Sequence, residues 1–112
     1  MEFPRNRLYE NSKNVIISDK VTSIGYGAFS GCFGLTNITI PGSVTSISSF
    51  AFYNCYGLTS IICKAVTPPS LSSNSFSVSK STPVYVPSES VEIYKTAQYW
   101  SEFTNIQAID EQ

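Results

Sequence analysis

The sequence offers few side chains for chemistry: three cysteines, eight carboxylates and no histidine. Without histidine, the chain lacks the side chain that most often acts as general base, metal ligand or member of a catalytic triad. Cys32 and Cys55 could serve as nucleophiles or metal ligands, but neither belongs to a C-x-x-C pair. A free cysteine commonly behaves as a small buried hydrophobic residue, so we interpret all three, Cys63 included, as core residues. The sequence therefore predicts no catalytic site, no metal site and no cofactor.

The carboxylates are not paired for acid–base catalysis either. Glu89 and Glu92 lie close together, but both fall at the start of a predicted helix, where negative charge is favourable. The others are Glu2, Glu10, Asp19, Glu102, Asp110 and Glu111. A hydrolase is therefore the least favoured functional class, and we expect a non-enzymatic protein.

The charge of the chain limits its partners. Charged residues make up 13% of the sequence, against roughly 25% in typical domains. The seven lysines and arginines are scattered, whereas nucleic-acid binding needs a concentrated positive field. No stretch approaches the ~20 apolar residues of a membrane helix. We therefore expect neither nucleic-acid binding nor membrane insertion. Residues 1–13 contain no apolar segment typical of a signal peptide, so an intracellular protein and one whose signal was removed both stay open.

Any functional side chain must be positioned by four short apolar triplets that recur every 23 residues. They are Val15-Ile16-Ile17, Ile38-Thr39-Ile40, Ile61-Ile62-Cys63 and Val84-Tyr85-Val86. A fixed step of this length is typical of a solenoid, in which the triplets stack as parallel strands. Side chains alternate along a strand, so the first and third positions of each triplet should face the core. The middle positions should form one outward row: Ile16, Thr39, Ile62 and Tyr85.

Residues 21–43 and 44–66 are two copies of one repeat. They align without gaps, and the shared residues include an Ala-Phe pair, a cysteine three residues later and a glycine two residues after the cysteine. This spacing predicts a helical turn packed inward and ended by Gly34 or Gly57 with positive φ. Stacking would also place Cys32 and Cys55 within disulfide reach, about 5 Å between Cα atoms, so a bond is possible but not expected.

The remaining segments diverge from this repeat. Residues 1–13 are polar and are interpreted as an N-terminal tail or a light cap. Residues 67–83 keep the 23-residue step but are rich in serine, which predicts a loop. Within this segment, Phe76 lies one residue out of register with Phe29 and Phe52, yet could fill the same core layer. Residues 88–112 predict a C-terminal cap. It contains a short helix over 88–103, with Ser88 or Ser90 as N-cap, and a strand-like segment at Ile106 and Ile109.

Two parts of the sequence resemble the BspA-like leucine-rich repeat of bacterial surface proteins. The repeat motif is present at Ile24, Ala28, Phe29, Cys32, Leu35, Ile38, Ile40 and Pro41, and the second copy departs from it at Cys63 and Lys64. The C-terminal segment, with Val84-Tyr85-Val86-Pro87, Trp100 and Phe103, resembles the end of such arrays in gut Bacteroidetes. The resemblance implies a leucine-rich-repeat α/β solenoid, a right-handed superhelix over 14–87 with a helical cap over 88–112. It also implies a secreted or cell-surface location and a role in adhesion or protein contact.

Two groups of residues are candidates for contact with a partner. The first is the outward row of Ile16, Thr39, Ile62 and Tyr85, which is unusually apolar for an exposed face. The second is aromatic: Phe33, its equivalent Tyr56, and nearby Tyr53. The alternative to partner contact is that the N-terminal tail or a neighbouring chain shields these side chains. We therefore expect a protein-interaction module that binds a host-matrix or surface protein. The alternative is a structural or self-associating terminal segment of a longer repeat array.

Overall fold

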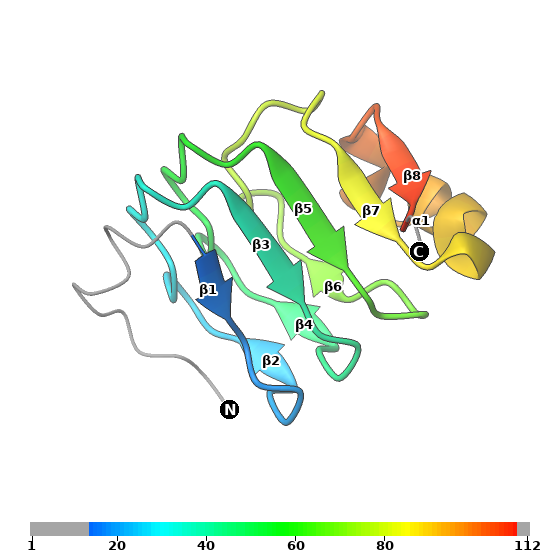
Figure 1. The fold of residues 1–112 in the computed structure, drawn as a ribbon, viewed down its shortest axis with the longest axis horizontal. Coiled ribbons are helices and arrows are strands. Elements are labelled where there is room, and N and C mark those ends of the chain that lie inside the picture. Colours follow the sequence, from blue (N-terminus) through cyan, green and yellow to red (C-terminus); the bar gives the residue numbers. More distant parts are fainter. Residues whose placement is uncertain (1–13, 110–112) are drawn as a thin grey trace.

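The computed structural model describes residues 14–109, which form a short solenoid of parallel strands closed by helical turns (Figure 1). Eight strands lie in two parallel sheets. The five-stranded sheet has the order β1-β3-β5-β7-β8, and the three-stranded sheet has the order β2-β4-β6. The bounds of the strands are β1 Asn14–Ile16, β2 Ser23–Ile24, β3 Asn37–Ile40, β4 Ser46–Ile47, β5 Ser60–Cys63, β6 Ser70–Leu71, β7 Val84–Val86 and β8 Ile106–Ala108.

The five-stranded sheet confirms the 23-residue step. Val15 pairs with Ile38, Ile38 with Ile61, and Ile61 with Val84. The first and third residues of every triplet are buried, as alternation predicts. The fold is therefore the α/β solenoid expected from the sequence. Residues 1–13, predicted as a tail or light cap, lie outside the described residues.

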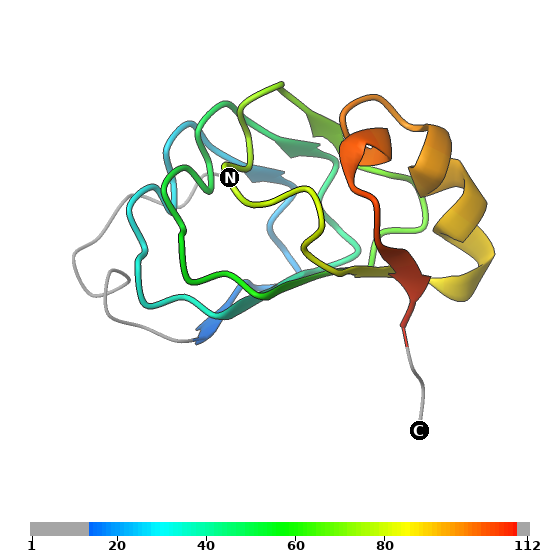
Figure 2. The same cartoon turned by 90° about the horizontal axis from the view of Figure 1, so that it is seen from above.

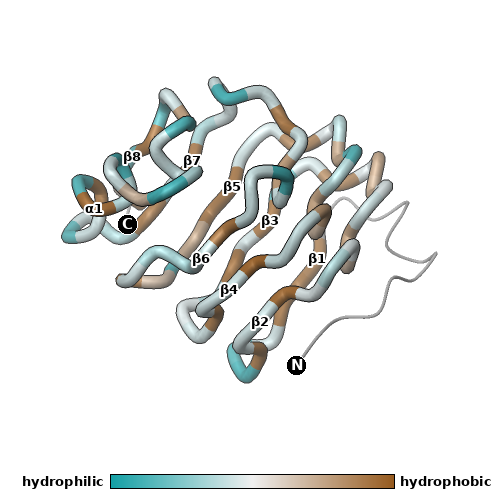
Figure 3. The backbone as a smooth tube through the Cα atoms, turned by 180° about the vertical axis from the view of Figure 1, so that it is seen from behind, coloured by the Kyte–Doolittle hydropathy of each residue, from teal (hydrophilic) through white to brown (hydrophobic). Residues whose placement is uncertain are grey.

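The three-stranded sheet lies on the opposite side of the core (Figure 2) and was not predicted. Its strands are only two residues long, each a polar residue followed by Ile24, Ile47 or Leu71. The Thr45 hydroxyl strengthens the stacking by donating to the carbonyl of Thr22, 3.1 Å away. Apolar segments therefore recur at equivalent places in successive turns (Figure 3).

The Ala-Phe-x-x-Cys segments form single turns rather than helices. In the first, Ala28, Ser30 and Cys32 donate to the carbonyl three residues earlier. The prediction that Gly34 and Gly57 take positive φ is wrong. Positive φ occurs instead at Gly27 and Gly31, and at the equivalent positions of the next repeat, Phe50 and Asn54.

Gly57 is needed for a different reason, which is close packing of successive turns. A Cβ at this position would lie 2.7 Å from the Phe33 carbonyl oxygen and 3.3 Å from that of Leu35. Both oxygens belong to the preceding repeat. The glycine therefore allows the backbones of neighbouring turns to approach each other.

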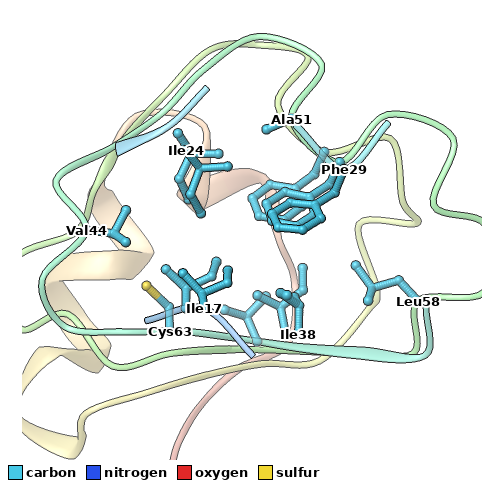
Figure 4. Close-up of a cluster of buried hydrophobic side chains, with 14 of the residues drawn as sticks. Ile17, Ile24, Phe29, Ile38, Val44, Ala51, Leu58 and Cys63 are labelled. Carbon is cyan, nitrogen blue, oxygen red and sulfur yellow. The ribbon is translucent and has the colours of Figure 1, made fainter. Parts of the chain in front are cut away.

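A column of stacked phenyl rings forms the centre of the core (Figure 4). Phe29 and Phe52 stack with centroids 5.3 Å apart, and Phe52 and Phe76 with centroids 4.9 Å apart. Phe76 thus fills the same core layer, as the sequence suggested. Its register shift is real: Ser46 pairs with Ser70, a step of 24, while the other sheet keeps its step of 23.

The C-terminal segment covers the end of the core. It contains the 3₁₀ turn η2 (Ser88–Ser90), helix α1 (Val91–Thr96) and the 3₁₀ turn η3 (Trp100–Glu102), and β8 then joins the sheet beside β7. The helix ends earlier than predicted because Ala97 is extended and Tyr99 has φ 69°. Ser90 stands at the N-cap position but makes no side-chain cap bond; its hydroxyl donates to the Val66 carbonyl, 2.7 Å away.

Candidate functional site

The outward row predicted from the triplets lies on the outer face of the five-stranded sheet, the face that Figure 1 presents. Ile16 pairs with Thr39, Thr39 with Ile62, and Ile62 with Tyr85. We call these four residues the strand-face row. The side chain of Ile16 is 92% exposed, whereas the other three are half-buried. Pairing of Tyr85 with Gln107 extends the row to β8, a member that sequence reasoning missed.

An open hollow of about 860 Å³ lies at the β1 end of this face. Its floor includes Ile16 and Thr39 from the row, together with Asn37. Asp19 follows β1 and Lys64 follows β5, and these two side chains of opposite charge line the hollow. The hollow therefore combines an apolar side chain with a few polar groups, as binding sites commonly do. Sequence reasoning missed Asp19 and Lys64 because they lie outside the alternating triplets.

The predicted aromatic residues divide into two ring contacts. Phe33 and Tyr56 stack across neighbouring repeats, with centroids 6.0 Å apart and planes 13° apart. Tyr53 does not join that stack; its ring contacts Phe50 edge to face, with centroids 4.9 Å apart.

A further ring, Tyr26, packs edge to face against Phe50 with centroids 5.5 Å apart. Sequence reasoning missed Tyr26 and Phe50. The available signal was Phe50 at the position equivalent to Gly27, where an aromatic residue replaces glycine. We call the five residues Tyr26, Phe33, Phe50, Tyr53 and Tyr56 the aromatic turn surface.

The cysteines are buried, as predicted, and their surroundings oppose thiolate chemistry. A hydrogen bond with Cys32, followed by burial, raises the pKa of the Cys55 thiol. Burial likewise raises the pKa of the Cys63 thiol, whose Sγ lies 3.3 Å from the Tyr94 hydroxyl oxygen. Since the thiolate is the reactive form, these side chains are poor nucleophiles.

Two acidic residues of the described chain form ion pairs on the surface. Glu92 pairs with Lys95 across one helical turn, and Glu102 pairs with Lys80, both at 3.6 Å. Within residues 14–109, no group of three histidine, cysteine or acidic side chains is arranged to hold a metal ion. In the same range, no helix is long and apolar enough to cross a membrane.

The repeat geometry agrees with a comparison against protein families. Residues 6–111 match the model of the BspA type leucine-rich repeat region, which contains six copies of the repeat. A search of curated proteins found no match to this chain. With the 23-residue step, the stacked phenyl column and this match over nearly the whole sequence, the chain belongs to the BspA-type leucine-rich repeat family.

Proposed function

We propose that this protein is a non-enzymatic interaction module whose strand-face row binds a protein partner. The observation that carries the proposal is the 92% exposure of Ile16 at the head of a row that continues through Ile62 and Tyr85. Isolated exposed hydrophobic residues need no explanation, but a row whose members are in register on neighbouring strands offers a larger contact area. Leucine-rich repeats of this family are generally binding modules, which supports the same reading.

The chemistry of the row fits a protein better than a charged metabolite. No member of the row carries a charge, and Asn37 and Ser60 flank it with uncharged polar groups. Interface cores are depleted in charged residues and enriched in tyrosine, as this row is. Full burial of an exposed apolar side chain contributes about 1.5–3 kcal/mol, and since Ile62 and Tyr85 are already half-buried, each would contribute roughly half of that against a partner. We extend the proposal to adhesion at the cell surface, with a host-matrix or surface protein as partner, because the family is typically surface-associated.

The test is a pair of substitutions on the row, Ile62→Lys with Tyr85→Lys, assayed against a partner obtained by affinity capture. We expect the affinity to fall at least about tenfold, because two lysines would have to be desolvated in the interface. A matched control is Val66→Lys with Ile93→Lys, which changes two exposed apolar residues near the cap. Equal loss in both variants, or no loss in the first, would exclude the strand face.

A second role, as the terminal segment of a longer repeat array, rests on a different observation. The turn η3 and helix α1 bury the aromatic end of the core under Trp100 and Tyr94. Such a cap is what the last repeat of an array requires. If this role accounts for the whole function, the captured partner will be a repeat segment of the same kind, and binding will not depend on Ile62 or Tyr85.

A further inference from the structure

A second surface lies on the turns that connect the two sheets in the complete repeats. Three of its rings are largely exposed: Tyr26 at 72%, Tyr56 at 71% and Phe33 at 59%. Phe33 and Tyr56 stack on each other, and their mean planes are nearly parallel. The strand-face row lies on the strands and contains none of these residues, so this aromatic turn surface is separate from the site of the proposed function.

Phe50, another residue of the aromatic turn surface, has an unfavourable backbone conformation. Phe50 has φ 61°, a left-handed value that glycine adopts easily and a bulky side chain does not. The equivalent residue of the preceding repeat is Gly27, at φ 65°. In this conformation the Phe50 ring contacts both Tyr26 and Tyr53. Residues with strained backbones are common at ligand-binding sites. Here the strained residue brings the rings of Tyr26, Phe50 and Tyr53 into contact.

The ligand class follows from the charge around these rings. From Val21 to Cys63 the chain contains no aspartate, glutamate, lysine or arginine, so the first complete repeat is uncharged and the second carries a single charge, Lys64, after its strand β5. Their polar side chains are hydroxyls and amides, such as Ser30, Ser49 and Asn54. Recognition of a charged ligand gains specificity from complementary charge, which these turns cannot supply, so an uncharged ligand suits them better.

We propose that the aromatic turn surface binds a neutral carbohydrate chain. A sugar ring has an apolar face of C–H groups that packs flat against an exposed aromatic ring, and its hydroxyls pair with neutral hydrogen-bonding groups. The Phe33 and Tyr56 rings stack across two repeats, and both residues stay largely exposed. The Tyr56 hydroxyl is already oriented by donating to Asn54 Oδ1, 2.7 Å away.

Affinity electrophoresis of the intact chain tests this proposal. The gels contain one soluble polysaccharide each: a β-glucan, an arabinoxylan, a galactomannan or, as a charged comparison, polygalacturonate. We expect at least one neutral polysaccharide to retard the protein, equally at low and high salt, because screening does not affect contacts between uncharged groups. Phe33→Ser with Tyr56→Ser should weaken that binding by about tenfold or more. The matched control, Val66→Ser with Ile93→Ser, should bind like the parent chain.

Several results would overturn the proposal. Retardation by none of the neutral polysaccharides would do so, as would retardation that survives loss of both rings. If the ring variant instead loses a captured protein partner while no polysaccharide binds, the surface is a protein interface. Thermal unfolding of each variant shows that it is folded, and Tyr26→Ser provides a second test on a single exposed ring. The strand-face variant Ile62→Lys with Tyr85→Lys should keep carbohydrate binding, which separates this proposal from the protein-binding one.

Discussion

At the scale of single residues, some phenylalanines of the repeats form the core and others lie on the surface. Phe52 is fully buried between Phe29 and Phe76, whereas Phe33 is 59% exposed. We expect Phe52→Ala to lower the free energy of unfolding by about 3–5 kcal/mol, because the cavity would interrupt the ring column. Phe33→Ala should change it by no more than about 0.5 kcal/mol. Urea unfolding curves measure both, and a loss below about 1 kcal/mol for Phe52→Ala would contradict the column as the centre of the core.

Two glycines differ in the space around them, which gives a second prediction. A Cβ at Gly57 would collide with a backbone oxygen of the preceding repeat at 2.7 Å, whereas at Gly42 the nearest atom is 3.4 Å away. Gly57→Ala should therefore destabilise the protein by about 1–3 kcal/mol, the range found for overpacking. Gly42→Ala should be close to neutral. Comparison of the two melting temperatures checks this, and equal shifts would show that the turns can separate without cost.

The glycines also show where sequence reasoning stops at this scale. The shared Gly34 and Gly57 suggested positive φ, but Gly57 is required by the close approach of two backbones. Positive φ falls at positions where the two repeats differ, glycine at 27 and phenylalanine at 50. A glycine pattern alone cannot distinguish conformational need from lack of space. The strain at Phe50 could not be predicted because the sequence does not show that Gly27, its equivalent in the preceding repeat, has positive φ.

At the scale of elements, predictability depends on the length of the apolar pattern. The triplets of β3, β5 and β7 alternate over three residues at a constant step, so their pairing and buried faces were predicted. Strands β2, β4 and β6 span two residues each, too few to show alternation. In addition, β6 follows β4 after 24 residues rather than 23, so it does not fit the repeat. The strand-face row was predicted for the same reason as the triplets. The hollow beside it was not, because Asp19 and Lys64 come from the loops after the strands.

The cap helix α1 provides a prediction about pH. The buried Tyr94 hydroxyl donates to the Ala65 carbonyl, 2.6 Å away, and burial, followed by its proximity to Cys63, raises its pKa. The folded state therefore keeps the phenol protonated, while the unfolded chain loses this proton above about pH 10. Since the folded pKa is raised, this stability is present below the unfolded value and is lost as pH rises beyond it. The raised thiol pKa values of Cys55 and Cys63 act in the same direction.

We therefore expect the free energy of unfolding to decline from about pH 8.5 upwards, where unfolded thiols begin to ionise. Tyr94→Phe should cost about 1–3 kcal/mol at neutral pH, because the Ala65 carbonyl loses its partner. The same variant should lose less additional stability between neutral and strongly alkaline pH than the parent chain. Denaturant titrations at a series of pH values measure both effects. Parallel pH profiles for the two chains would show that the phenol is not the titrating group.

At the scale of the whole molecule, each turn of the solenoid is stabilised mainly by its neighbours. Sheet pairing, the phenyl column and the hydroxyl bonds of Thr45 and Thr59 all connect one turn to the previous one. The column continues into the cap, where the ring centroids of Trp100 and Phe103 each lie 6.0 Å from the ring centroid of Phe76. Trp100 is fixed by its indole N–H, which donates to the Pro69 carbonyl at 2.8 Å. The cap is thus the last layer of the core.

Removal of this layer should affect all turns together. In a chain lacking residues 88–112, Val84, Val86 and Phe76 would lose the cover that keeps them at most 5% exposed. Because an uncapped solenoid end exposes its core, we expect loss of cooperative thermal unfolding and association of the truncated chains in size-exclusion chromatography. The graded variant Trp100→Ala should remain folded but lose about 3–5 kcal/mol, whereas Ile93→Ala, on an exposed position of α1, should stay within about 0.5 kcal/mol of the parent. A truncated chain that melts cooperatively at the parent temperature would show that the repeats are stable without the cap.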